Sequence, residues 1–196
     1  MNKKIIFTEE DILSAMEAFG TYIDITPEDF KKLYQIVLEK VKEKFLYEVK
    51  AKDFMNPEVL WVSPEEKLDE VIIKMAEKGV SGVPVVEGER VIGILSEKDI
   101  LKGIGVSSPA GLLSAVAECL KRSECLLEGV LTKKVKDLMT TPAITVNLDE
   151  PAAKVIELFK KKGINRVPVV DSEGRLKGIV ARGDLFSLPF FAEELL

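Results

Sequence analysis

The sequence contains one pattern of about 50 residues twice, and this duplication constrains the fold more than any other feature. The stretch from Ser81 to Leu101 reads SGVPVVEGERVIGILSEKDIL, and the stretch from Asn165 to Phe186 reads NRVPVVDSEGRLKGIVARGDLF. An earlier motif, Lys52-Asp53-Phe54-Met55, returns 84 positions later as Lys136-Asp137-Leu138-Met139. Because a unit of about 50 residues is small for an independent domain, we expect the two copies to pair.

The duplication divides the 196-residue chain into four segments. We expect an N-terminal helical hairpin at 1–48, a first repeat at 49–104, a helical connector at 105–133, and a second repeat with the C-terminal tail at 134–196. Each repeat is expected to run strand or linker, helix, strand, strand, helix. This order predicts a mixed α/β (α+β) fold.

The helix of each repeat has recognisable start and stop signals. Ser63 is followed three residues later by Glu66, which resembles a capping box, and Gly79 marks the expected end. In the second repeat Asn147 is the expected N-cap. A short final helix is expected from Glu97 and again from Gly183. Apolar runs predict the strands, which are expected at 83–86, 91–95, 167–170 and 176–180.

The N-terminal segment predicts two helices. Thr8 is the expected N-cap of the first helix, and Pro27 is the expected first residue of the second. An apolar stripe follows on the second helix and consists of Phe30, Leu33, Val37, Val41 and Phe45. The stripe either packs on the repeats or forms a dimerisation or partner-docking surface, and the sequence leaves both interpretations open.

The connector and the tail carry further expectations. Ser108-Pro109 predicts a helix start in the connector, and the spacing of Cys119 and Cys125 does not match a zinc site. We interpret both cysteines as reduced, partly buried thiols, with a redox role as the alternative. The tail, with Phe190 and Phe191, is expected to pack on the core or on a neighbouring subunit.

Composition excludes several function classes. The 28 basic and 33 acidic residues are mixed along the chain and give a net charge of −5, which argues against nucleic-acid binding. No apolar run is long enough for a membrane span, and no signal peptide is visible, so we expect a cytoplasmic protein without membrane insertion. The chain has no histidine, which removes the usual general base, and we do not expect an enzyme.

The doubled order of motifs, Asp-h-Met, then hPVV, then G-h-h-S-x-x-D, where h is apolar, resembles a tandem pair of cystathionine-beta-synthase (CBS) domains, also called a Bateman module. The resemblance covers about three quarters of the chain, from Val49 to Leu188. It implies two beta-alpha-beta-beta-alpha units packed sheet to sheet about a pseudo-twofold axis, with association into a homodimer. It also implies binding of adenosine-containing ligands between the units and regulation of a partner, here a separate enzyme or transporter.

The residues themselves make such a site plausible. A ribose diol needs a fixed carboxylate, and Asp99 and Asp184 each stand just after a strand at the start of a helix, where free backbone N–H groups favour a phosphate. Ser96 adds a hydroxyl in the first repeat. The segments 80–84 and 164–168 are expected to hold adenine, because Pro84 and Pro168 are expected to interrupt strand pairing.

The resemblance implies that the Asp of one repeat works with the residue before the apolar-Pro pair of the other, which pairs Ser96 and Asp99 with Arg166. The two clefts are therefore unequal, because Ala181 replaces Ser96 and Gly82 replaces Arg166 at matching positions. We expect the Asp99 cleft to be the main site. Its implied residues are Ser96, Lys98, Asp99, Arg166, Val167 and Pro168. The Asp184 cleft would use Ser81, Gly82, Val83, Pro84, Arg182 and Asp184.

Structural alternatives exist for these residues. Ser96 and Asp99 also form a capping-box-like helix start that needs no ligand, and Arg166 is equally typical of a surface ion pair. Asp184 is present although the side chain of Ala181 cannot cap, and this observation favours a binding role for the carboxylates.

Three function classes follow. The first is a regulatory module that binds AMP, ADP or ATP, with no obligatory cofactor; S-adenosylmethionine and NADH share the adenosine part and are not separated by the sequence. The second is a structural or interaction module with degenerate clefts. The third is an enzyme, which ranks last because no nucleophile–base pair or metal cluster is visible.

Overall fold

The structure of the chain is a computed structural model that describes residues 9–18, 25–103 and 132–189. The chain divides into two compact units, Met1–Glu48 and Val49–Leu196. Several expectations fall outside the described residues, namely those on Thr8, Ser108, Cys119, Cys125, Phe190 and Phe191.

The N-terminal unit contains the two expected helices, α1 (Glu9–Ala18) and α2 (Pro27–Glu48), which contact each other. Pro27 is the first residue of α2, and the Thr26 hydroxyl accepts the Asp29 N–H at 3.2 Å, which caps the helix. Within the described residues of α2 no side chain is fully buried. Packing of its apolar stripe on the repeats or on a partner stays a prediction.

The second unit contains both repeats. The first repeat has α4 (Leu68–Glu77), β1 (Gly82–Glu87), β2 (Arg90–Ser96) and α5 (Glu97–Gly103). The second has β3 (Val146–Asn147), α8 (Ala152–Lys162), β4 (Arg166–Val170), β5 (Leu176–Ala181) and the 3-10 helix η2 (Arg182–Ser187). Two short helices precede them, α3 (Ala51–Phe54) and η1 (Val135–Asp137). The predicted final helix of the second repeat is therefore a short 3-10 helix, which is followed by Pro189.

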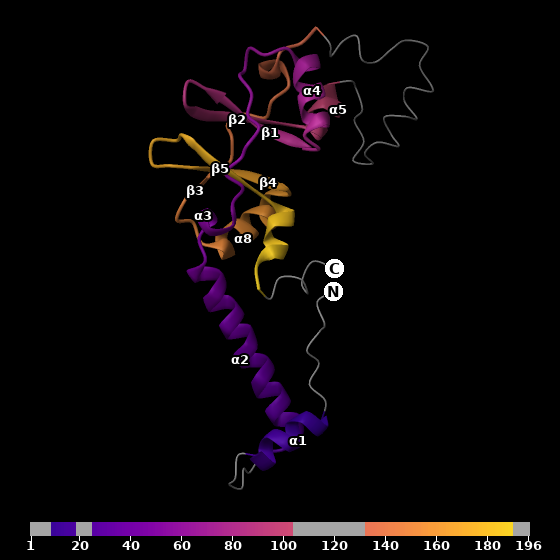
Figure 1. Ribbon diagram of the computed structural model, residues 1–196, viewed down its shortest axis with the longest axis vertical. Coiled ribbons are helices and arrows are strands. Elements are labelled where there is room, and N and C mark those ends of the chain that lie inside the picture. The colour runs from indigo at the N-terminus through magenta and orange to yellow at the C-terminus, as the bar shows by residue number, and fades with distance from the viewer. Residues whose placement is uncertain (1–8, 19–24, 104–131, 190–196) are drawn as a thin grey trace, which may run out of the picture. The chain divides into compact units, whose positions relative to one another are not determined.

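Each repeat is built on one antiparallel hairpin. The pairs β1–β2 and β4–β5 form these hairpins, and β3 adds a parallel strand to β4. In the first repeat a single residue, Val62, pairs in parallel with Val85 and corresponds to β3. Figure 1 shows the two hairpins next to each other, with α4 and α5 outside the first and α3 and α8 outside the second. The predicted mixed α/β fold is confirmed.

The segment that leads into the first repeat packs on the second repeat. The Ala51 N–H donates to the Glu150 carbonyl at 2.8 Å, and the Ala152 N–H donates to the Val49 carbonyl at 2.9 Å. Ala51 and Phe54 are buried, and α3 contacts β5 and η2. The first leading segment therefore completes the core of the second repeat.

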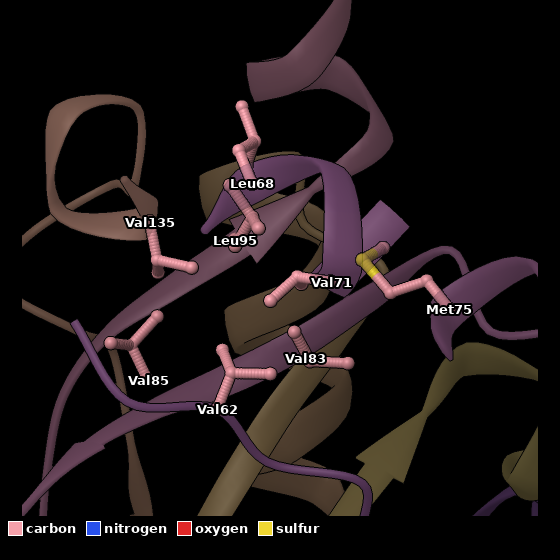
Figure 2. Close-up of a cluster of buried hydrophobic side chains, with 8 residues drawn as sticks. All are labelled: Val62, Leu68, Val71, Met75, Val83, Val85, Leu95 and Val135. Carbon is pink, nitrogen blue, oxygen red and sulfur yellow. The ribbon is translucent and has the colours of Figure 1, made fainter. Parts of the chain in front are cut away.

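The segment that leads into the second repeat packs on the first in the same way. The Val135 N–H donates to the Glu66 carbonyl at 3.0 Å, and the Leu68 N–H donates to the Lys133 carbonyl at 3.0 Å. Figure 2 shows Val135 among the buried side chains of the first repeat. This cluster consists of Val62, Leu68, Val71, Met75, Val83, Val85, Leu95 and Val135. The two repeats exchange their leading segments, so neither core is complete without the other repeat.

The exchange explains two of the repeated motifs. A Cβ placed on Gly93 would lie 2.8 Å from the sulfur of Met139, and one placed on Gly178 would overlap Met55. In each case the methionine belongs to the exchanged segment of the other repeat. The glycine of the G-h-h pattern in one repeat is therefore required by the methionine of the Asp-h-Met pattern in the other repeat.

The expected starts of the two repeat helices are wrong by several residues. The Ser63 N–H does donate to the Glu66 carboxylate at 2.7 Å, but α4 begins at Leu68. In the second repeat Asn147 lies in β3, and Pro151 is the N-cap of α8. The physical reason is the exchange, because backbone pairing with the incoming segment holds Lys67 and Pro151 extended, and each helix begins only after that residue.

The expectation that Pro84 and Pro168 interrupt strand pairing is also wrong. Pro84 pairs with Ile94, and Pro168 pairs with Ile179, inside continuous strands. The Ile94 N–H and carbonyl both bond to Thr140, on the side away from Pro84, so no proline N–H is needed there. The same holds at Ile179, whose backbone groups bond to Asn56.

Among the described helices, none has both the length and the apolar character that a membrane crossing requires.

The exchanged core gives the first prediction. Val135 is 0% exposed, so Val135→Ala should lower the free energy of unfolding by about 2 kcal/mol, although the residue lies outside the first repeat in sequence. Thermal or urea denaturation measures the change. Ile73→Ala, which truncates a side chain that is 58% exposed on α4, is the control and should stay within about 0.5 kcal/mol of wild type. Equal, small effects of both substitutions would contradict the exchange.

Candidate functional site

Asp99 is the buried charged residue of the described chain and the centre of the candidate site. It lies in the first turn of α5, directly after β2, and is 8% exposed. The Oδ2 atom accepts the Ser96 N–H at 2.9 Å and also the Ser96 hydroxyl. The Oδ1 atom accepts the hydroxyl of Thr140 at 2.9 Å. A buried carboxylate is stable here because three donors surround it.

Arg166 brings a cation from the second repeat to the first. It begins β4, and its Nη2 donates to the Ser81 hydroxyl. Its Nη1 is buried without a hydrogen-bond partner among the described residues. Burial lowers the pKa of the Arg166 guanidinium, while the charge of Glu97 acts in the opposite direction. Arginine stays protonated through such changes, so the site holds a cation with unused donor capacity.

Gly82 makes room for this guanidinium. A Cβ at position 82 would overlap the Nη1 of Arg166 and would lie 3.1 Å from the carbonyl of Leu95. Gly82 also pairs with Ser96 across the β1–β2 hairpin, so the residue that the guanidinium contacts lies opposite the first residue of the Ser96–Asp99 turn. We refer to Ser81, Gly82, Ser96, Asp99, Thr140 and Arg166 together as the Asp99 site.

The carboxylate of the second repeat has fewer partners. Asp184 accepts the Ala181 N–H at 2.7 Å through Oδ2, and no other donor to its carboxylate is found among the described residues. Asn56 is the residue equivalent to Thr140 in the other copy of the motif. Its side-chain oxygen accepts the Glu58 N–H at 2.9 Å instead of contributing to the Asp184 carboxylate. The two halves of the molecule therefore surround their aspartates differently.

The geometry at Asp184 corrects one expectation. The presence of Asp184 beside Ala181 was expected to favour binding over capping. In the structure both aspartates cap their own turns through backbone N–H groups, of Ser96 and of Ala181. The Asp184 carboxylate accepts the backbone N–H of Ala181, which is present whatever side chain stands at position 181. The absence of a hydroxyl at Ala181 therefore carries no information about ligands.

The structure also regroups the predicted residues. The sequence assigned Ser81 and Gly82 to the Asp184 cleft, and the structure brings both to Arg166. Val83 and Val167 are core side chains, 1% and 0% exposed, while Pro84 and Pro168 are buried inside their strands. Lys98 and Arg182 are exposed. Contact of these six residues with a ligand stays a prediction.

Sequence reasoning missed Thr140 and Glu97. Thr140 follows the Asp-h-Met motif of the second repeat and reaches the first only through the exchange. The one available signal was the substitution of Asn56 by Thr140 between otherwise matching motifs. Within the described residues no group of acidic, cysteine or histidine side chains is suited to a metal ion.

A cavity of about 370 Å³ lies apart from both carboxylates. It is bounded by the β1–β2 turn, the start of β5 and the segment from Pro57 to Trp61. Trp61 is 53% exposed there, and Arg175 is engaged by Asp171 at 2.8 Å. The cavity contains no residue of the Asp99 site.

Comparison with known proteins identifies the family. Two stretches of the chain, residues 51–105 and 135–189, match the CBS domain. The chain belongs to the CBS-domain family. This CBS pair is 35% identical over 147 residues to the uncharacterized protein MJ1426 of Methanocaldococcus jannaschii, a match that covers 68% of this chain and 87% of that protein.

Two further relatives show how widely the pair occurs. The crystal structure of CBSX2 in complex with AMP has 28% identity, a TM-score of 0.56, and coverage of 70% of this chain and 94% of that chain; CBSX2 comes from Arabidopsis thaliana. The inosine-5'-monophosphate dehydrogenase of Korarchaeum cryptofilum is 27% identical over 190 residues, which is 95% of this chain but 33% of that enzyme. Because two thirds of the enzyme are unmatched, its activity does not carry over.

The packing of Arg166 on Gly82 gives the second prediction. Gly82→Ala should destabilise the chain by about 1–3 kcal/mol, because the added methyl group displaces the guanidinium. Gly183→Ala is the matched control, since a Cβ there meets nothing within 4 Å. The cost of Gly82→Ala should shrink in an Arg166→Ala background, as measured by a double-mutant cycle of unfolding free energies. Strict additivity of the two substitutions would contradict the contact.

Proposed function

We propose that this CBS pair is a regulatory module that binds an adenosine-containing ligand, AMP, ADP or ATP, at the Asp99 site. The observation that carries the proposal is a buried carboxylate of the first repeat, Asp99, together with a half-buried guanidinium of the second, Arg166, whose Nη1 atom is buried and has no hydrogen-bond partner among the described residues. A buried, unpartnered donor is costly, and a ligand anion would remove that cost.

The two groups suit the two polar parts of a nucleotide. A carboxylate accepts hydrogen bonds from the hydroxyls of a ribose, and a guanidinium donates to phosphate in a planar fork. A cation at this place favours phosphate-bearing ligands, including NADH, over S-adenosylmethionine, whose sulfonium is itself positive. The crystal structure of CBSX2 with AMP, at 28% identity, supports the ligand class.

The position of the site supports regulation. Asp99 belongs to the first repeat, and Arg166 and Thr140 belong to the second, so a ligand that bonds to these groups bridges both. Such a ligand stabilises one arrangement of the repeats only if its affinity differs between arrangements. A separate enzyme or transporter that reads the change, a homodimer and a cytoplasmic location stay predictions.

A second function class, a structural or interaction module, is favoured by one specific observation. Ser96 and Ala181 already engage the two carboxylates, and Ser81 already engages Arg166. A CBS pair whose polar groups mostly have hydrogen-bond partners within the chain can serve as a scaffold without any ligand.

Ligand binding gives the third prediction. A ligand at one hundred times its dissociation constant should stabilise wild type by about 2.7 kcal/mol and raise its melting temperature by about 5–10 °C. Thermal shift and calorimetry with AMP, ADP, ATP, adenosine, NADH and S-adenosylmethionine measure this. Asp99→Asn should weaken nucleotide binding about 10- to 100-fold, because charge-assisted hydrogen bonds are lost.

Asp184→Asn is the matched control, because it makes the same chemical change at the equivalent position of the second repeat. It should leave the affinity within about threefold of wild type. Arg166→Met should remove the preference for AMP over adenosine. If nucleotide-free wild type shows no shift with any of the six compounds, the scaffold is the better account.

A further inference from the structure

The hydroxyl of Thr140 lies on the carboxylate that the proposed function assigns to a ribose. Its hydrogen bond to Asp99 Oδ1, at 2.9 Å, joins side chains from different repeats, and the two residues are 41 positions apart in the sequence. The Thr140 backbone is fixed independently, because its N–H and carbonyl bond to Ile94 at 2.8 and 3.0 Å. The side chain can therefore turn away from Asp99 without moving the chain.

Counting acceptors shows a conflict with a diol. A carboxylate has about four acceptor positions, two on each oxygen. Oδ2 already accepts the Ser96 N–H and the Ser96 hydroxyl, and Oδ1 accepts Thr140. Counted over the described residues, one position remains, on Oδ1. A ribose 2',3'-diol donates two hydrogen bonds, so one of the present hydroxyls has to leave when the diol binds.

Thr140 is the hydroxyl that leaves at the lower cost. The Ser96 hydroxyl belongs to the residue whose N–H also bonds to Oδ2, so Ser96 stays beside that oxygen in any case. Thr140 is an exposed residue, and its freed hydroxyl can bond to water. Its departure leaves both positions on Oδ1 open to the diol.

We propose that Thr140 is a positioning residue that closes the Asp99 site in the free chain, and that a ligand diol opens the site by replacing its hydroxyl on Asp99. This inference rests on the proposed function. It adds a switch, because binding breaks a side-chain link between the repeats while the backbone link at Ile94 remains. In the part of the second repeat that the structure describes, no side chain closes Asp184 in this way, since Asn56 turns to Glu58 and leaves Asp184 with the Ala181 N–H.

The test compares Thr140→Val with Thr140→Ser and with Thr141→Val. Thr140→Val removes the hydroxyl at nearly constant shape, and Thr140→Ser keeps it. Thr141→Val is the matched control, because the neighbouring hydroxyl donates to the Ile92 carbonyl at 2.9 Å and does not touch Asp99. Both valine variants lose one hydrogen bond, so both free chains should melt a few degrees lower than wild type.

The affinity for AMP distinguishes Thr140→Val from the other two variants. Calorimetry with AMP should give on the order of tenfold tighter binding for Thr140→Val, because no hydrogen bond to a charged group has to be broken first. Thr140→Ser and Thr141→Val should stay within about threefold of wild type. With 2'-deoxy-AMP, which needs a single acceptor, Thr140→Val should change the affinity by no more than about twofold. A purely structural role of Thr140 would not change this ratio between the two ligands.

The outcomes for the two proposals are distinct. AMP binding by wild type tests the proposed function, and the ratio of Thr140→Val to wild type tests the closure. If wild type binds AMP and Thr140→Val binds it equally or more weakly, the closure is overturned and the proposed function stands. If Thr140→Val alone binds, the closure is supported, while the proposed function fails for the wild-type chain. If neither binds, both proposals fail.

Discussion

The exchange of leading segments between the two repeats is the constraint on which the rest of the structure depends. Val135 fills the core of the first repeat, and Ala51 and Phe54 help to fill that of the second. The same exchange places Glu65 between Lys134 and Lys136, at 2.7 and 2.6 Å, and these lysines lower the pKa of Glu65 to about 2. At the surface such pairs add little stability, so the buried side chains dominate the coupling of the repeats.

The exchange also builds the candidate site. Thr140 reaches Asp99 because the second leading segment pairs with Ile94, and Arg166 reaches Gly82 because the two hairpins lie together. Because both repeats contribute groups to the site, the affinity for a ligand bound there would depend on how the repeats are arranged, as the proposed regulatory role requires. The buried Nη1 of Arg166 supplies the physical reason to expect an anionic group there.

The sequence predicted the fold well because the duplication specified which elements exist and in which order. The strands around Val85 and Val169 and the helices carrying Val71 and Val155 follow from local apolar patterns. The helix starts at Ser63 and Asn147 were misjudged because local capping signals compete with pairing to a segment far away in sequence. Thr140 was missed for the same reason, since no local pattern shows that its hydroxyl lies on a carboxylate of the other repeat.

Native-state hydrogen exchange can show whether the two repeats form one cooperative unit. The Ile94 and Ile179 amides each donate to the exchanged segment of the other repeat, to Thr140 and to Asn56 respectively, both at 3.0 Å. We expect both amides to exchange only through a common opening, with equal free energies that fall together on mild destabilisation. Exchange of one amide through a separate, lower-energy opening, while the other stays protected, would show that a repeat unfolds alone and that the two repeats are not one cooperative unit.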